Sequence, residues 1–287
     1  MLLSKKILLP LLLTVIFSCK NSEEDVNRTT WISGQIVNPT IDFVIFSRGN
    51  HILDTVKLDS NNFFLYKTEK IKPGLYSFTH NESQVFYIEP GDSLLIHLNT
   101  FDFDESLAYS GKGSEQNNLL MELYLRNETE NQNLSSWYVL PSNEFDQKID
   151  SLRQEKISNY NTFLENTEVD EGFKEVALAN ITYDYYSKKE LYAAANMSQP
   201  NKFDPDYFDY RKEIDFNLNK LKFYYPYYRF LIRYFDNMAI SEMGGKMPID
   251  RNSFEYNYKK IKLIDSLIPS DSLKNNLLRF NTKRYLL

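Results

Sequence analysis

The chain has 287 residues, of which 42% are hydrophobic and 25% charged, and its formal net charge is −6. This composition is typical of a globular protein long enough to bury one or two cores. The acidic balance argues against a nucleic-acid-binding role, which needs a basic face, and against electrostatic attraction to anionic lipid.

Residues 1–18 have the layout of a secretory signal peptide. Lys5 and Lys6 form a charged start, an apolar stretch covers residues 7–17, and the small residue Ser18 precedes Cys19, the only cysteine of the chain. The apolar stretch is shorter than the ~20 residues that a membrane-spanning helix needs. We therefore expect export of the chain and cleavage after residue 18.

Cys19 is the expected site of lipid attachment. Residues 15–19 resemble the lipobox of bacterial lipoproteins, in which a small residue precedes the lipidated cysteine. The resemblance implies a protein held at a membrane by two or three acyl chains. Lys20 in the next position is similar to outer-membrane sorting signals. The alternative is an ordinary signal peptide that ends by chance in a cysteine.

Residues 19–29 are expected to form a flexible acidic tether, because they are polar and have no apolar periodicity. Their acidic cluster resembles the surface-export signal of some Gram-negative lipoproteins, and the alternative is a charge run that is merely solvated. The residues of this cluster are Ser22, Glu23, Glu24 and Asp25.

Residues 30–112 are predicted to form an all-β domain. Short runs of β-branched and aromatic residues recur at intervals of about ten residues and are separated by turn residues such as Asn38-Pro39 and Pro90-Gly91. This spacing is typical of an antiparallel sandwich or barrel. The expected strands cover residues 31–37, 43–46, 52–58, 63–66, 75–78, 85–88 and 94–98.

Residues 113–287 are predicted to form an all-α domain, because from Ser114 onward apolar residues recur at helical spacing. We expect about six helices, with starts near Ser114, Ser142, Glu171, Tyr225, Phe254 and Asp271. The fold class is therefore α+β, with an N-terminal antiparallel β-sandwich or barrel-like domain followed by an all-α helical domain.

Residues 31–125 resemble the N-terminal β domain and following helical segment of bacterial thiol–disulfide interchange lipoproteins, the TlpA/ResA-like family. In that family a thioredoxin-like module with a Cys-x-x-Cys pair follows. This sequence has no such pair, so no redox residue is carried over. The segments that carry the resemblance are Ser33-Gly34-Gln35-Ile36, Leu53-Asp54-Thr55-Val56 with Leu58-Asp59, Pro73-Gly74-Leu75-Tyr76, Pro90-Gly91-Asp92-Ser93-Leu94, and Gly111-Lys112-Gly113-Ser114 with Asn117.

A tyrosine-rich segment near the fourth expected helix is the candidate ligand-binding site. Two arginines lie one helical turn apart beside several tyrosines, which would suit a groove for a sugar or a peptide. The alternative is a helix buried by its neighbours, with its tyrosine hydroxyls hydrogen-bonded inside the protein. The candidate residues are Tyr224, Tyr225, Tyr227, Tyr228, Arg229 and Arg233.

No catalytic residue, metal site or cofactor is predicted. The three histidines have no local nucleophile or carboxylate partner, so we expect them to be solvated or on edge strands. Two carboxylate groups lack the glycine and terminal glutamate of a calcium loop and are expected in loops and caps. These residues are His51, His80 and His97, then Asp102, Asp104 and Glu105, and finally Asp204, Asp206 and Asp209.

The expected function is that of a non-enzymatic, lipid-anchored outer-membrane protein of the cell envelope. The membrane is its expected partner through the lipid on Cys19, together with a protein partner or an envelope ligand, and no nucleic acid. Two alternatives remain open. One is a truncated or split relative of a thiol–disulfide oxidoreductase lipoprotein, and the other is a carbohydrate-binding lipoprotein.

Overall fold

The computed structural model describes residues 29–245 and 248–286. The predictions for the signal peptide, for Cys19 and for the acidic cluster at residues 22–25 concern residues outside these ranges. Within the described ranges, no helix has the length and apolar character needed to cross a bilayer.

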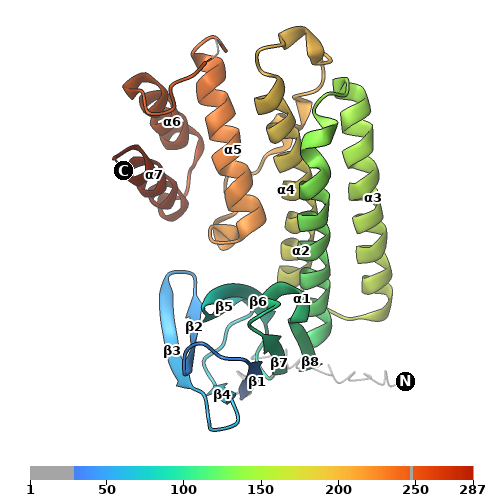
Figure 1. Cartoon of the computed structure of the whole chain (residues 1–287), viewed down its shortest axis with the longest axis vertical. Coiled ribbons are helices and arrows are strands. Elements are labelled where there is room, and N and C mark those ends of the chain that lie inside the picture. Colours follow the sequence, from blue (N-terminus) through green and yellow to red (C-terminus); the bar gives the residue numbers. More distant parts are fainter. Residues whose placement is uncertain (1–28, 246–247, 287) are drawn as a thin grey trace, which may run out of the picture.

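Eight strands of the described residues form two four-stranded sheets at one end of the molecule (Figure 1). Seven of them coincide with the expected runs, and the eighth, at the end of the β region, was not expected. The strands are β1 (Thr30–Val37), β2 (Phe43–Arg48), β3 (His51–Lys57), β4 (Phe63–Thr68), β5 (Gly74–His80), β6 (Glu82–Ile88), β7 (Ser93–Asn99) and β8 (Ala108–Lys112).

The strand orders are β4-β1-β7-β8 and β3-β2-β5-β6. All pairings are antiparallel except that of β1 with β7, which run parallel with Trp31 opposite Ser93 and Val37 opposite Asn99. This departs from the antiparallel expectation. A parallel pair needs a long connection. Between β1 and β7 the chain forms β4, which joins their sheet, and the four strands of the other sheet, β2, β3, β5 and β6.

Alternating residues of each strand build the core between the two sheets. On β1, Ile32 and Ile36 are buried, while Trp31 is partly exposed on the outer face. Phe46 on β2 contacts the rings of Phe64, Tyr66 and Phe86 in the space between the sheets. Period-two burial of this kind is the reason that the sequence pattern indicates strands.

In the described part of the chain, seven α-helices follow the strands or interrupt them, and the six long ones match the six expected starts. The overall class is therefore α+β, as predicted. The helices are α1 (Phe103–Ser106), α2 (Ser114–Leu134), α3 (Ser142–Asn166), α4 (Glu171–Asn196), α5 (Tyr225–Glu242), α6 (Phe254–Leu267) and α7 (Asp271–Leu286). The loop between α4 and α5 contains three short 3₁₀ turns.

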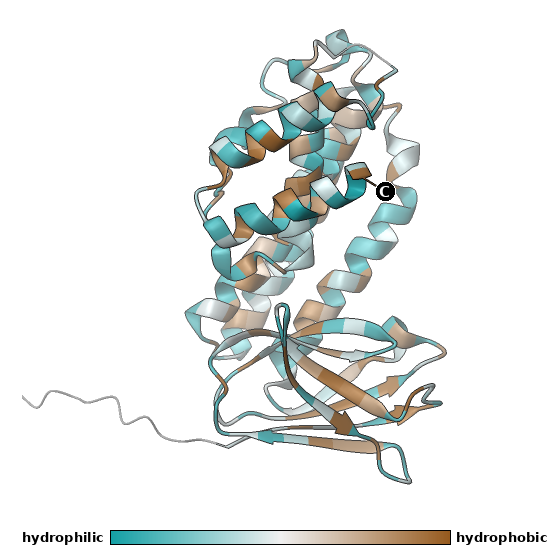
Figure 2. Cartoon of the chain, turned by 90° about the vertical axis from the view of Figure 1, so that its left-hand side faces the viewer, coloured by the Kyte–Doolittle hydropathy of each residue, from teal (hydrophilic) through white to brown (hydrophobic). Residues whose placement is uncertain are grey.

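The helices α2 to α5 stand beside one another above the sandwich, and α6 and α7 pack on the outer side of α5 (Figure 1). Hydrophobic and hydrophilic residues alternate along the helices in Figure 2, as expected for amphipathic elements. The helical core is rich in aromatic rings: Phe145 stacks on Tyr192 with ring centres 4.2 Å apart, and Tyr183 contacts Tyr227 and Phe230.

Side chains at the start of α2 hold the helical part on the sandwich. The buried Asn117 side chain accepts a hydrogen bond from the Tyr87 backbone N–H and donates one to its carbonyl, each at 2.7 Å. Asn118 pairs in the same way with the backbone of Tyr109 on β8. The Tyr87 hydroxyl reaches the opposite way and donates to Asp170, the residue that caps α4, at 2.8 Å. These bonds tie β6, β8, α2 and α4 together.

His80 departs from the sequence prediction. The exposed His51 and His97 are solvated as expected, but His80 is fully buried on β5, an inner strand. Its Nδ1 lies 3.0 Å from the Phe43 carbonyl oxygen. The run around it alternates in the normal way, so the histidine follows Tyr76 and Phe78 onto the buried face.

Candidate functional site

A cavity of about 610 Å³ lies where α2, α4 and α5 meet the edge strand β6 of the sandwich. This volume falls within the range of about 300–1,000 Å³ that small-molecule sites occupy. Exposed residues such as Glu82, Ser83, Glu128 and Tyr225 mark its mouth. Buried residues of α4, including Asn180, Asp184 and Ser187, form its depth.

Arg233 on α5 is the most unusual residue of this cavity. It lines the wall, yet none of the residues in the described ranges forms a hydrogen bond or an ion pair with its guanidinium. Burial and the positive charge of Arg229 together lower the pKa of Arg233 to about 10. Largely buried arginines are ordinarily paired with an acid, because an uncompensated charge away from water is costly.

Arg229 lies one helical turn before Arg233 and lines the same wall. Its guanidinium donates a hydrogen bond to the Tyr225 hydroxyl and lies 5.1 Å from the centre of the Tyr225 ring. Burial lowers the pKa of Arg229, opposed by the more distant charge of Asp184. Two cationic side chains therefore face one cavity without a carboxylate within ion-pair distance of either one, among the residues that the structure describes.

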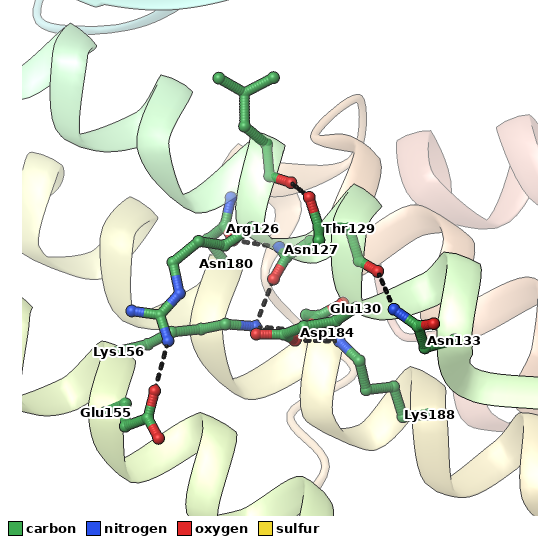
Figure 3. A network of polar contacts seen from close by, with 11 residues as sticks. Arg126, Asn127, Thr129, Glu130, Asn133, Glu155, Lys156, Asn180, Asp184 and Lys188 are labelled. Atoms are coloured by element: carbon green, nitrogen blue, oxygen red, sulfur yellow. Dashed lines mark hydrogen bonds and ion pairs between the residues drawn. The ribbon is translucent and has the colours of Figure 1, made fainter. Parts of the chain in front are cut away.

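A network of buried charges, drawn in Figure 3, reaches the cavity through Asp184, which also lines it. Lys156 on α3 donates to Glu130 at 2.7 Å and to Asp184 at 2.9 Å, and Lys188 contacts the same two carboxylates. Burial opposes the ionisation of Asp184, but Lys188 and Lys156 outweigh this effect and hold the pKa of Asp184 below its ordinary value. The network contains two cations and two anions, so its acids are already paired with lysines, and Asp184 acts on the two arginines only through its more distant charge.

Two polar atoms on the cavity wall have no hydrogen-bond partner in the described part of the chain. They are the hydroxyl oxygen of Ser187, a residue only 4% exposed, and the amide oxygen of Asn131. Buried polar groups are almost always hydrogen-bonded to protein, to ordered water or to a ligand. The wall thus offers hydrogen-bonding groups that the protein itself does not use.

Three carboxylates also line the cavity. Glu82 on β6, Asp104 on α1 and Glu128 on α2 all line it, and the Tyr124 hydroxyl donates to Asp104 at 3.0 Å. Burial, this hydrogen bond and the charges of the three carboxylates raise the pKa of Tyr124. The three acids therefore gather around one tyrosine hydroxyl, although they come from three different elements.

The structure brings four of the six sequence-predicted ligand residues to the cavity, namely Tyr224, Tyr225, Arg229 and Arg233. The other two lie elsewhere. Tyr227 is buried in the helical core, where its hydroxyl donates to the Asp215 carbonyl at 2.9 Å, and Tyr228 packs edge-on against Phe280. Only Tyr225 of the four tyrosines is exposed, so these rings form no exposed row.

The sequence reasoning missed the polar residues that α2, α3 and α4 contribute. One signal was available: the middle turns of α4, from Ile181 to Tyr192, are rich in aromatic residues, yet they carry Asp184, Ser187 and Lys188. Charged and polar residues among large aromatic residues in one helix indicate a buried polar site. Within the described ranges, no group of three or more acids, histidines or cysteines that could hold a metal ion is found.

Comparison of the chain with protein-family models, with curated proteins and with solved structures finds no match.

Proposed function

We propose that this protein binds a small molecule with an anionic group in the cavity between β6, α2, α4 and α5, and acts by binding rather than catalysis. Lipid on Cys19 would hold it at the outer membrane of the cell envelope. The observation that carries the proposal is the cavity-lining guanidinium of Arg233, which is largely buried and has no acidic partner in the described chain.

A purely structural role explains Arg233 less well. Elsewhere in the same helical domain, Arg211 is also largely buried, and there it forms two hydrogen bonds to the fully buried Glu190, at 2.9 and 2.7 Å. Among the residues that the structure describes, Arg233 has no such acid, and the nearby Asp184 is already bonded to two lysines. A carboxylate, sulfonate or phosphate entering the cavity would supply the missing charge and accept the unused guanidinium hydrogen bonds.

The remaining wall suits the body of a small molecule. Leu120, Val85 and Pro226 offer apolar contacts, while the unused hydroxyl of Ser187 offers a hydrogen bond. Mainly apolar walls with a few convergent polar groups are typical of ligand sites. The flat exposed aromatic surface that a carbohydrate platform would use is not formed by the four candidate tyrosines, so we favour an anionic ligand over a neutral sugar.

The binding proposal is tested with the full chain in detergent, by calorimetry and thermal shift against a panel of small carboxylates, sulfonates and phosphates. We expect at least one to bind, and Arg233→Gln to weaken it about tenfold or more, because a charged hydrogen bond contributes ~1.5–3 kcal/mol. The matched control is Arg279→Gln, an exposed arginine on α7. If no anion distinguishes wild type from Arg233→Gln, the proposal is wrong.

The anchoring proposal is tested separately, in cells fed a fatty-acid probe. We expect the wild type to carry the probe and to fractionate with membranes, and Cys19→Ala to lose both properties. A Glu23→Gln/Glu24→Gln variant should still carry the probe. Only the accessibility of the protein to protease added outside the cell should change. A wild-type protein without the probe would show that the anchoring proposal is wrong and would leave the binding proposal unaffected.

A further inference from the structure

We infer that the ligand is a zwitterion, a free amino acid or short peptide, whose carboxylate contacts Arg229 and Arg233 while its ammonium group faces Glu82, Asp104 and Glu128. This inference rests on the proposed function and names the class of molecule that the same cavity takes.

Groups of both charge signs line the cavity, and they come from different elements. Both arginines come from one face of α5, whereas three carboxylates come from β6, α1 and α2. The Tyr124 hydroxyl lies among these carboxylates and donates to Asp104. A molecule with charges of both signs can pair with both sets of groups at once, and a simple anion can pair only with the arginines.

The total charge also disfavours a strongly anionic ligand. The cavity is lined by four carboxylates and two guanidinium groups, and the buried network behind Asp184 adds two ammonium groups and one further carboxylate. The local net charge is therefore −1. A phosphate dianion would meet the acidic rim at a cost, because like charges in a partly desolvated site repel strongly. A ligand with no net charge avoids that cost.

The uncharged groups of the wall match a peptide. The amide oxygen of Asn131 can accept a hydrogen bond from a ligand N–H, and the Ser187 hydroxyl can donate to a ligand carbonyl. Leu120, Val85 and Tyr224 provide contacts for an apolar side chain. A backbone with one donor and one acceptor, flanked by terminal charges of opposite sign, uses all of these features.

The test compares alanyl-leucine and alanyl-phenylalanine with their N-acetylated and C-amidated forms, by calorimetry on the full-length protein in detergent. Acetylation removes the ammonium charge and amidation removes the carboxylate, with little change in size. We expect the free dipeptides to bind about fivefold or more tighter than the acetylated forms, a modest factor because the rim is partly exposed to solvent. We expect amidation to weaken binding about tenfold or more.

The double variant Glu82→Gln/Glu128→Gln should remove the preference for the free amine and leave the acetylated forms unchanged. Glu115→Gln, an exposed carboxylate on α2 that does not line the cavity, is the matched control. Arg233→Gln should weaken the free and acetylated forms alike.

The outcomes separate the two proposals. Equal binding of free and acetylated dipeptides, with both weakened by Arg233→Gln, overturns the zwitterion and leaves the anion site intact. A preference that survives the double variant also overturns it. If no dipeptide binds at millimolar concentration while a simple carboxylate does, the peptide class is wrong; if neither binds, the proposed function fails as well.

Discussion

Lys156 on α3 and Asp184 on α4 form an ion pair with Nζ and Oδ2 2.9 Å apart, and their side chains are only 2% and 11% exposed. Together with Glu130 and Lys188, the pair fixes the spacing of three helices behind the cavity (Figure 3). Because all four charges are inside the protein, removing one leaves another without compensation.

Lys156→Met is therefore expected to lower the free energy of unfolding by about 3–5 kcal/mol, the usual result of breaking a buried pair from one side. Urea unfolding followed by circular dichroism measures the change. The control is Lys212→Met, whose lysine is 77% exposed in its pair with Asp209 and should contribute less than about 1 kcal/mol. Equal effects of the two substitutions would contradict the role given to the network.

The same network predicts a loss of stability in acid. Since the pKa of Asp184 is lower in the folded protein than in the unfolded chain, its charge stabilises the fold fully above about pH 4. The contribution disappears as the pH falls through the folded-state pKa. Urea unfolding from pH 7 to pH 3 should show wild type more stable than Asp184→Asn at pH 7, with the gap closing toward pH 3. A gap that widens on acidification would reverse the sign of this argument.

Arg233→Gln should behave in the opposite way to Lys156→Met. Because the pKa of Arg233 is lowered to about 10 in the folded protein, its positive charge costs stability at every pH below that value. Without ligand, the substitution should leave the free energy of unfolding unchanged or raise it by about 1–2 kcal/mol. Arg211→Gln leaves the buried carboxylate of Glu190 without its ion-pair partner, so it should instead lower the free energy of unfolding by about 3–5 kcal/mol. Thermal and urea unfolding of both variants provide the comparison.

Asn117→Ala should weaken the attachment of α2 to the sandwich. The substitution leaves the buried backbone N–H and carbonyl of Tyr87 without partners, which should cost about 1–3 kcal/mol. Asn133→Ala, at an exposed position on the same helix, is the control. Hydrogen exchange supplies a local measurement, because the Tyr87 amide should exchange faster in Asn117→Ala alone. Unchanged protection of that amide would show that another group holds it.

Seven strands and six long helices could be predicted because each is bounded by turn or cap residues and has a clear period. β8 was missed because only Tyr109 of its five residues is buried, and because Gly111, at φ +84°, interrupts the apolar pattern. Local periodicity also does not predict which strands pair with one another in a sheet. The parallel pairing of β1 with β7 joins segments about sixty residues apart and depends on the order in which strands enter the sheet.

Only the part of the candidate site that α5 contributes could be predicted from the sequence. Helical spacing places Arg229 and Arg233 on one face of α5, and the structure brings both to the cavity. The same spacing does not show whether a tyrosine faces the core, as Tyr227 does, or the cavity, as Tyr224 does. The other walls come from elements 40 to 150 residues away in the sequence, so no local pattern brings Glu82 or Ser187 to the arginines.

The position of β1 has a mechanical consequence. The first described strand is not at the edge of its sheet but between β4 and β7, hydrogen-bonded along both sides. A force applied to the amino-terminal end of this strand, directed along it, would load both ladders in shear, so many bonds must yield together rather than peel one by one. The body of the protein is thus built to resist being pulled apart from the end at which the preceding segment joins it.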